Sequence, residues 1–489
     1  MIDLLVVGAG INGAGIARDA AGRGLKVALI DAGDIGGATS SASTKLIHGG
    51  LRYLEHYAFR LVAEALAERE VLWRIAPHLA RPMRFVVPLM HGSRPAWMIR
   101  IGLILYDRLA ARGKLPDHVA LDLTRDPAGE PLKAGIRRGF EYSDLWVDDS
   151  RMTLLNALDA AERGAAVHPH TELVEARREG GLWHATLEHD GARRELTARA
   201  LVNATGAHVA ALYDRLGVAS PRPIRLVRGS HIAVAALFDH DRAYLCQNPD
   251  GRVIFAIPWE GLTVIGTTDV EQALDEPVQA SAAEIAYLCE AASAWFRRPI
   301  EPADVVHDWA GLRALAAEPG GRAQEASREY KLELDANGPA LLSVFGGKLT
   351  TYRTLSQNAL TELAPSLPAM GPEWTGTEPL PGGDLEDVDA LAADIRARHP
   401  ALGEVDALRI ARAYGTRVWA WLTSDLGRDF GGGLMAAEVR YLMDQEWAVS
   451  ADDVLWRRTK LGLRLTEEQA AALGEWMVER AAQAPSMPA

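Results

Sequence analysis

The sequence predicts an α/β protein with several domains, and three observations support this prediction. The first 31 residues contain an apolar strand, a glycine-rich turn that opens a helix, and a second apolar strand. Residues from about 225 to 270 are rich in β-branched side chains with turn signals between them, which indicates an antiparallel sheet. Residues 385–489 have a helical pattern. A chain of 489 residues has room for about two to four domains.

The N-terminal unit is a β-α-β unit with a glycine-rich turn. A strand over residues 2–7 leads into Gly8-Ala9-Gly10-Ile11-Asn12-Gly13, and a helix follows through Arg23, with Gly24 at its C-terminal end. The second strand, residues 26–30, ends at Asp31. This strand–turn–helix–strand context makes the glycine spacing a strong signal for a bound dinucleotide.

Each residue of this fingerprint has a physical role. Gly8 permits the tight turn, Gly10 lets the backbone approach a pyrophosphate, and Gly13 lets the helix pack closely on the strand. The helix N-terminus offers N–H groups to the phosphates, and Asp31 is placed to accept hydrogen bonds from the ribose hydroxyls. A late strand over residues 200–204, followed by Thr205-Gly206, favours FAD over NAD. We therefore expect a Rossmann-like FAD-binding fold of the glutathione-reductase type.

The remaining elements predict how this fold is interleaved with other domains. We expect helices over 58–76 and 151–163 and strands over 230–235, 253–257, 262–266 and 340–346, whereas 80–145 shows a mixed pattern. A stretch rich in proline and glycine predicts a linker at 365–384. The expected organisation is an FAD-binding domain (1–79, 146–210 and 335–364), an antiparallel-sheet substrate domain (80–145 and 211–334), and a C-terminal helical domain (385–489).

Composition excludes several classes of protein. Fifty-two basic and 65 acidic residues give a net charge of −13, which argues against general nucleic-acid binding. Cys246 and Cys289 are too few for a disulfide scaffold or a four-thiolate zinc site, so we expect reduced thiols and no metal site. The N-terminus shows no signal peptide, and no apolar run reaches the roughly 18 residues of a spanning helix.

Several longer motifs resemble one family along almost the whole chain. Besides the N-terminal fingerprint, they are Thr39-Ser40-Ser41-Ala42-Ser43-Thr44-Lys45-Leu46-Ile47-His48-Gly49-Gly50-Leu51-Arg52-Tyr53-Leu54-Glu55-His56-Tyr57, Val227-Arg228-Gly229-Ser230-His231, Ile265-Gly266-Thr267-Thr268-Asp269, Gly311-Leu312-Arg313, Phe345-Gly346-Gly347-Lys348-Leu349-Thr350-Thr351-Tyr352-Arg353 and Trp456-Arg457-Arg458-Thr459-Lys460. In this order they resemble the respiratory, aerobic type of FAD-dependent glycerol-3-phosphate dehydrogenase.

The resemblance implies oxidation of sn-glycerol 3-phosphate to dihydroxyacetone phosphate. A hydride would pass from C2 to flavin N5, and the electrons would then go to a membrane quinone. The resemblance implies that the phosphate and hydroxyls are bound by Arg52, Tyr53, His48, Arg313 and Lys348, and cationic side chains suit a phosphate. The base is left between His231 and His48, and Arg313 or Lys348 would stabilise the alkoxide.

The resemblance also implies a set of cofactor-binding residues: Gly8, Gly10, Asn12, Gly13, Asp31, Thr39, Ser40, Ser41, Ser43, Lys45, Leu46, Ala204, Thr205, Gly206, Gly347, Lys348, Leu349 and Thr350. Three positions depart from the family pattern. Ala314 stands where proline is usual, in what we expect to be a loop that holds Arg313. Ala207-His208 stands where Pro-Trp is usual, and Arg228 stands where lysine is common.

Residues 94–114 predict contact with a membrane surface. They carry five basic residues against Asp107, and an apolar run with Trp97 and Tyr106 as interfacial aromatics. A buried helix with basic ends is the alternative. We expect a peripheral protein at the cytoplasmic face of the inner or plasma membrane, and a homodimer. Arg457, Arg458 and Lys460 are interpreted as a solvated charge cluster.

Other functions remain open at this point. The first alternative is a glycerol-3-phosphate oxidase that passes electrons to oxygen and forms peroxide. An amine or amino-acid oxidase is a more distant one, because a single carboxylate needs fewer cationic partners. A redox-silent flavin-binding subunit is a third, although the presence of Arg52, Arg313 and Lys348 argues against it.

Overall fold

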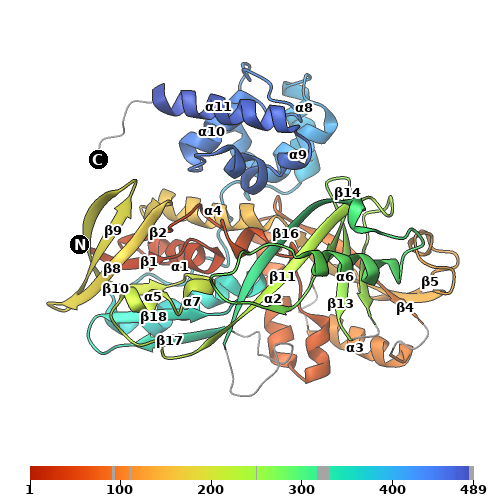
Figure 1. Ribbon diagram of the computed structural model, residues 1–489, viewed down its shortest axis with the longest axis horizontal. Coiled ribbons are helices and arrows are strands. Elements are labelled where there is room, and N and C mark those ends of the chain that lie inside the picture. Colours follow the sequence, from red (N-terminus) through yellow and green to blue (C-terminus); the bar gives the residue numbers. More distant parts are fainter. Residues whose placement is uncertain (91–93, 110–112, 114, 249–250, 317–329, 484–489) are drawn as a thin grey trace.

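Two β-sheets lie side by side, and a separate group of helices packs above them (Figure 1). This arrangement is seen in a computed structural model that describes residues 1–90, 94–109, 113, 115–248, 251–316 and 330–483. Within these residues the side chains of Arg52, Glu55, His56 and Ala316 are not described. The predicted mixed α/β class with a helical C-terminal region is confirmed.

The first sheet contains the predicted N-terminal strands. Its order is β17-β18-β10-β1-β2-β7, and the five strands from β18 to β7 run parallel. A hairpin that the sequence pattern does not predict, β8 and β9, extends β10 on its antiparallel side. The strands are β1 (Ile2–Val7), β2 (Val27–Ile30), β7 (Ala166–His168), β8 (Thr171–Glu179), β9 (Leu182–His189), β10 (Ala192–Asn203), β17 (Lys331–Asp335) and β18 (Ala340–Phe345).

Helix α1 (Ile11–Gly22) lies beside this sheet, and α4 (Asp149–Glu162) and α7 (Tyr352–Leu363) both pack against α1. Alanines and branched aliphatic residues of α1 are fully buried between the strands and the other two helices. Strands buried on both faces are expected to be apolar runs, as β1 and β2 are. Gly24 has a φ of +89°, the left-handed conformation predicted for the residue that ends α1.

The second sheet contains the predicted strands near 225–270. Its order is β15-β11-β14-β13-β12-β4-β6-β3, with β16 beside β11 and β5 beside β6, and every pair is antiparallel except β12 with β4. The region with a mixed sequence pattern, 80–145, supplies β4, β5 and β6. The strands are β3 (Leu46–Ile47), β4 (Ala80–Leu89), β5 (Val119–Asp122), β6 (Arg138–Val147), β11 (Ile224–Ala235), β12 (Ala243–Gln247), β13 (Val253–Trp259), β14 (Leu262–Gly266), β15 (Val270–Glu271) and β16 (Val305–Ala316).

Helix α6 (Ala282–Ser293) packs on one face of this sheet, and Cys246 and Cys289 are free thiols in that core. Helices α2 (Phe59–Ile75) and α3 (Ala96–Leu109) lie against the other side, and α5 (Leu212–Arg215) is a short turn after β10. Among the described residues, no group of three or more candidate side chains could hold a metal ion, and no helix is long and apolar enough to cross a membrane.

The C-terminal helices form a third core of their own. They are α8 (Val388–Arg398), α9 (Glu404–Tyr414), α10 (Ala436–Gln445) and α11 (Glu467–Gln483). The predicted segments 385–398, 434–446 and 466–483 match helices, whereas 404–423 is a helix followed by a 3-10 turn. The domain boundaries themselves stay a prediction.

The interpretation of Arg457, Arg458 and Lys460 as a solvated charge cluster is wrong. The Arg458 side chain is 1% exposed and binds the buried Asp34 carboxylate, which also accepts Arg457 Nε at 2.5 Å. Lys460 is buried beside Ser150, and burial lowers its pKa to about 8. These cations fasten the C-terminal helices to the loop after β2 and to the start of α4.

Candidate active site

The carboxyl ends of four neighbouring parallel strands meet at one edge of the first sheet. Gly8 follows β1, Asp31 follows β2, Ala204 follows β10 and Gly346 follows β18. In open parallel sheets this edge is where ligands bind. The structure therefore brings together predicted cofactor-binding residues that the sequence scatters from Gly8 to Thr350.

Asp31 and the glycines shape this edge. The Asp31 carboxylate accepts the Ala9 N–H at 2.7 Å and the Gly33 N–H at 2.8 Å, and burial raises its pKa. A Cβ on Gly13 would lie 1.8 Å from the Gly8 carbonyl oxygen, so only glycine fits there. Gly8 has a φ of +103° and allows no side chain either, because a Cβ there would lie 2.5 Å from the Ala204 oxygen.

The residues at the start of α1 fit a bound dinucleotide. Gly10, the N-cap, has no side chain to bind the first amides, and the Ile11 N–H reaches Ser40 Oγ at 3.0 Å. Asn12 donates its Nδ2 to the Gly346 oxygen at 3.1 Å, while its buried Oδ1 has no hydrogen-bond partner among the described residues. Buried polar atoms are rarely left without partners, so a donor on a ligand is expected there.

Two later segments complete the edge. Thr205 Oγ1 donates to Asn203 Oδ1 at 2.7 Å, and Gly206 opens a 3-10 helix, η4 (Gly206–His208), which contains the departure Ala207-His208. A Cβ on Gly347 would lie 2.6 Å from Asn12 Nδ2, so that glycine faces the dinucleotide turn. Lys348 then caps a second 3-10 helix, η6 (Leu349–Thr351), which contains Leu349 and the buried Thr350.

Residues 39–46 connect the two sheets. Thr39 Oγ1 donates to the Leu312 oxygen on β16 at 2.7 Å, and Ser41 Oγ donates to the Ala38 oxygen. Ser43 and Lys45 both bind the Asp149 carboxylate, with Lys45 Nζ at 2.8 Å, and Leu46 begins β3. The Ser43 and Lys45 side chains are therefore held by Asp149, at the start of α4.

His231 lies on β11 of the second sheet, between β14 and β16. Its ring stacks on Trp309 with centroids 5.2 Å apart, and its Nε2 lies 2.9 Å from Thr44 Oγ1. Burial, followed by Arg313 and Lys45, lowers its pKa to about 3, so the ring is neutral near pH 7. Its buried Nδ1 has no hydrogen-bond partner within the described part of the chain.

Arg313 lies on the same face of the second sheet, on β16. Its guanidinium binds Asp269 Oδ1 at 2.5 Å and Thr267 Oγ1 at 3.1 Å. A Cβ on Gly229 would lie 2.4 Å from Arg313 Nη2, so this glycine makes room for the arginine. The expected loop around Arg313 is instead a paired strand, because Ala314 continues β16 opposite Leu226.

Lys348 and Tyr53 are brought together from distant motifs. The Lys348 Nζ lies 4.1 Å from the centroid of the Tyr53 ring. His48 packs edge-on against Phe255 at 6.2 Å. The remaining candidate of this motif, Arg52, has a side chain outside the described part of the structure.

Sequence reasoning missed some residues of this region. Trp309, which stacks on His231, carries no signal beyond its place in an aromatic-rich strand, and Asp269, which binds Arg313, is only the last residue of a longer motif. Arg228, which departs from the family pattern, points away from the site and binds Glu284 on α6 at 2.7 Å.

Comparisons with known proteins agree with this architecture. Residues 3–353 match the model of the FAD dependent oxidoreductase family, and residues 374–483 match the C-terminal domain of alpha-glycerophosphate oxidase. The solved glycerol-3-phosphate dehydrogenase of Bacillus halodurans, complexed with FAD, aligns with a TM-score of 0.79 at 26% identity, over 99% of this chain and 91% of that one.

Relatives over nearly the whole chain are closer in sequence. A glycerol-3-phosphate dehydrogenase of Pseudomonas aeruginosa is 53% identical over 97% of this chain and 94% of its own. The aerobic glycerol-3-phosphate dehydrogenase of Escherichia coli is 49% identical, with 99% of both chains covered. A D-erythritol 1-phosphate dehydrogenase of Brucella abortus is 47% identical over 97% of each chain.

The fold and the dinucleotide edge define an FAD-dependent oxidoreductase, which confirms the predicted cofactor at the level of the family. Within that class, the chain belongs to the glycerol-3-phosphate dehydrogenase family.

Proposed function

We propose that this protein oxidises sn-glycerol 3-phosphate to dihydroxyacetone phosphate and passes the electrons to a membrane quinone. The observation that supports this proposal most directly is the approach of Lys348 to Tyr53 at the carboxyl end of β18. It places a cation and a phenol from two separate motifs beside the cofactor edge. Relatives with this activity at about half identity over the full chain support the same substrate.

The cationic groups suit a phosphate. Lys348 supplies a point charge, and Arg313 supplies a planar donor set held in place by Asp269. Bound FAD would supply the hydride acceptor. Lys348 and Arg313 then favour the negative charge that develops on the C2 oxygen when its proton leaves.

The neutral His231 is a candidate acceptor for that proton. Its low pKa makes it a weak base, but a doubly charged phosphate brought near the ring raises the pKa by favouring the imidazolium. His48, in the Tyr53 motif, remains the second candidate. The Thr44 hydroxyl orients the His231 ring through Nε2.

One experiment tests the reaction. Purified protein with its flavin is mixed without oxygen with glycerol 3-phosphate, and the flavin absorbance is followed. Bleaching is expected. Bound FAD that stays oxidised would contradict the proposal and would favour a redox-silent flavin subunit.

A second candidate substrate is a longer polyol phosphate, favoured by the Brucella abortus relative that acts on D-erythritol 1-phosphate at 47% identity. The two phosphates are compared by their bleaching rates at equal concentration. Faster bleaching by erythritol 1-phosphate would show that the longer polyol phosphate is the preferred substrate. Glycerol 3-phosphate is expected to be faster, because the two most similar relatives named above act on it.

The electron acceptor is tested in the same preparation. The alternative, an oxidase, is favoured by the match of residues 374–483 to a glycerophosphate oxidase domain. Quinone reduction without peroxide supports the dehydrogenase. Stoichiometric peroxide with no quinone reduction would favour the oxidase.

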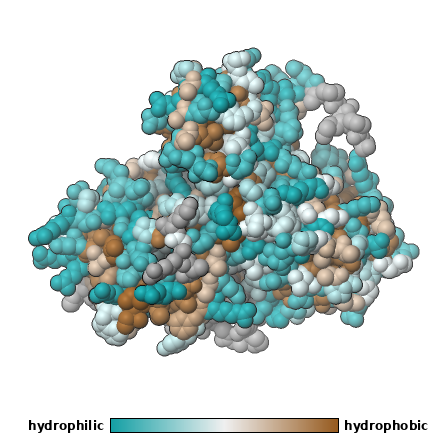
Figure 2. Space-filling model, turned by 180° about the vertical axis from the view of Figure 1, so that it is seen from behind, coloured by the Kyte–Doolittle hydropathy of each residue, from teal (hydrophilic) through white to brown (hydrophobic). Residues whose placement is uncertain are grey.

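Helix α3 is the proposed contact with a lipid surface. Its outer face exposes Trp97, Met98, Ile101, Ile104 and Leu105, and Figure 2 shows hydrophobic side chains at the lower edge of the molecule, where this helix lies. Arg100 and Arg108 are exposed beside them, which suits anionic lipid headgroups.

Part of the membrane prediction needs correction. Tyr106 is not an interfacial aromatic, because it is 1% exposed and its hydroxyl donates to Asp144. Lys114 and Arg112 lie outside the described residues. A peripheral position at the cytoplasmic face of the inner or plasma membrane and a homodimeric state complete the proposal.

A further inference from the structure

Gly49 connects the substrate motif to helix α3. Its N–H donates to the Tyr106 hydroxyl at 2.7 Å, and the bond is buried. Gly49 follows His48 directly and precedes Gly50, whose Cβ would lie 2.3 Å from the Tyr53 ring. The backbone at Gly49 therefore sets where His48 and Tyr53 stand.

The Tyr106 hydroxyl is itself fixed. It donates to the Asp144 carboxylate on β6 at 2.8 Å, and Asp144 is paired with Arg69 Nη1 on α2 at 2.9 Å. Asp144 and Tyr106 are each 1% exposed. Because the donor hydrogen is directed to Asp144, the oxygen lone pairs of Tyr106 are turned toward Gly49.

The space at Gly49 admits no other residue. A Cβ there would lie 2.6 Å from Leu66 Cδ2 and 2.8 Å from the Tyr106 oxygen. Gly50 has a φ of +75°, which strains any residue with a side chain. Tyr106 thus touches a segment of backbone that has little freedom to move away.

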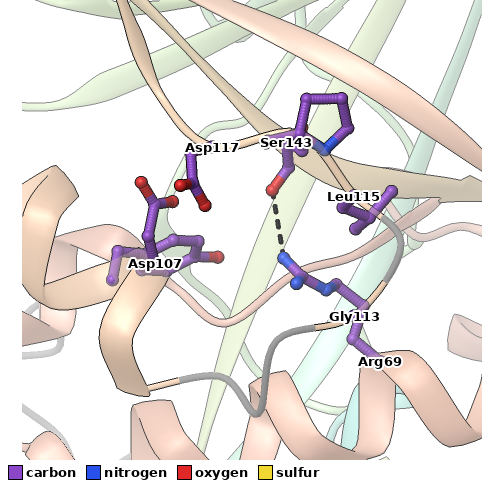
Figure 3. Close-up of a pocket in the computed structure, with 8 residues that line it drawn as sticks. Arg69, Asp107, Gly113, Leu115, Asp117 and Ser143 are labelled. Carbon is purple, nitrogen blue, oxygen red and sulfur yellow. Dashed lines mark hydrogen bonds between the residues drawn. The ribbon is translucent and has the colours of Figure 1, made fainter.

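A polar cavity of about 320 Å³ adjoins these groups. It is lined by Arg69, Tyr106, Asp107, Gly113, Leu115, Pro116, Asp117 and Ser143, and Figure 3 shows Arg69 reaching the Ser143 oxygen across it. A polar cavity of this size holds water. Asp144 is bonded to two of the lining residues, Arg69 and Tyr106, and burial raises its pKa to about 6.

We propose that Tyr106 is a positioning residue for the substrate site: held by Asp144, it fixes the Gly49 amide and with it His48 and Tyr53. The inference rests on the proposed function, because His48 and Tyr53 are its substrate-binding residues. The groups that face Asp144 are Arg69, Tyr106, the Tyr142 ring and the Gly49 amide, and Glu70 lies behind Arg69.

The test compares KM for glycerol 3-phosphate in the wild type and in Tyr106→Phe. The variant keeps the ring and loses the acceptor for the Gly49 N–H, so KM is expected to rise about tenfold with unchanged FAD content. Tyr142→Phe is the matched control. It removes a hydroxyl from a ring that packs edge-to-face against Tyr106 and leaves the bond between Gly49 and Tyr106 intact.

The pH dependence separates positioning from a structural role. Protonation of Asp144 below about pH 6 removes the charge-assisted bond in the wild type, so the KM ratio of variant to wild type should fall toward one in acid. The substrate phosphate titrates near the same pH, with a second pKa of about 6, but its effect cancels in the ratio. A lower melting temperature with an unchanged KM would make Tyr106 merely structural.

A second variant guards against misfolding. If Tyr106→Phe loses FAD or does not fold, Asp144→Asn is used instead. It must raise KM for glycerol 3-phosphate at neutral pH and flatten the dependence of KM on pH. Wild-type KM values in either variant at every pH would overturn the inference. Flavin bleaching by the wild type is measured first, because its absence would refute the proposed function instead.

Discussion

The ammonium group of Lys348 lies 4.1 Å from the centre of the Tyr53 ring, although one residue follows strand β18 and the other belongs to the motif near residue 50. A cation over an aromatic face is attracted by the partial negative charge that the ring quadrupole places on that face. The pair therefore joins the cofactor edge of the first sheet to the segment from His48 to Tyr53. This is the segment that Tyr106, on α3, holds through the Gly49 amide.

Replacing Lys348 with glutamine is expected to raise KM for glycerol 3-phosphate by about ten- to a hundredfold, because a charged partner of the phosphate is lost. Steady-state kinetics with an artificial acceptor measures this effect. Tyr53→Phe keeps the ring under Lys348 and should have a smaller effect than Tyr53→Leu. The exposed Lys26→Gln is the control, and an equal change there would contradict a local role for Lys348.

The parts of the fold that are predictable depend on short stretches of sequence. Gly8, Gly10, Gly13 and Asp31 stand at fixed spacings, so the first β-α-β unit can be placed from the order of its residues alone. The contact of Thr44 with His231 cannot be placed in this way, because it depends on how the loop before β3 packs against strand β11, far later in the chain.

Removing the Asp31 carboxylate tests the dinucleotide edge. Asp31→Ala leaves the Ala9 N–H without its acceptor at the end of β1, so FAD affinity is expected to fall about ten- to a hundredfold. Titration of the apoprotein with FAD, followed by flavin fluorescence, measures it. Asp3→Ala is the matched control, since Asp3 binds the Lys26 N–H at the opposite end of the same strand. Equal losses in both variants would point to sheet damage instead.

The lowered pKa of His231 predicts how the stability of the fold depends on pH. Its folded pKa of about 3 lies below its ordinary value of 6.5, so the unfolded chain binds more protons between these values. Stability contributed by the neutral ring is therefore lost as the pH falls below 6.5, by up to about 1 kcal/mol per pH unit. The melting temperature of the wild type minus that of His231→Asn should shrink in acid. A constant difference would mean that His231 titrates normally in the folded protein.

Arg458 and Tyr106 illustrate what the sequence does not reveal. The pattern around each predicts that it faces outward, since a run of basic residues is usually solvated and an apolar helix with Tyr is typical of an interface. Their partners, Asp34 and Asp144, lie in unrelated parts of the chain. Only the tertiary structure brings those carboxylates to them.

The pair of Asp34 and Arg458 should stabilise the docking of the C-terminal helices. Asp34→Asn leaves a buried guanidinium without its carboxylate, which is expected to cost about 3–5 kcal/mol. Denaturant unfolding measures this loss in the first transition. Glu64→Gln breaks the exposed pair with Arg60, which is expected to change stability by less than about 1 kcal/mol. Similar effects of the two substitutions would show that burial adds nothing to the first pair.

The last prediction concerns the binding of the α3 surface to anionic lipid. Arg100→Glu combined with Arg108→Glu reverses two exposed charges beside the apolar face, and each basic residue near such a surface contributes about 1 kcal/mol. Co-sedimentation with phosphatidylserine vesicles should therefore fall at least about tenfold. Arg177→Glu with Arg193→Glu makes the same charge change on the hairpin around β9 and should leave binding within about twofold. If the hairpin variant is released equally, net charge and not α3 holds the protein to the vesicle. If neither variant is released, either the apolar face of α3 suffices for binding or α3 is not the contact. Trp97→Ala then distinguishes these two outcomes, because only in the first should it release the protein.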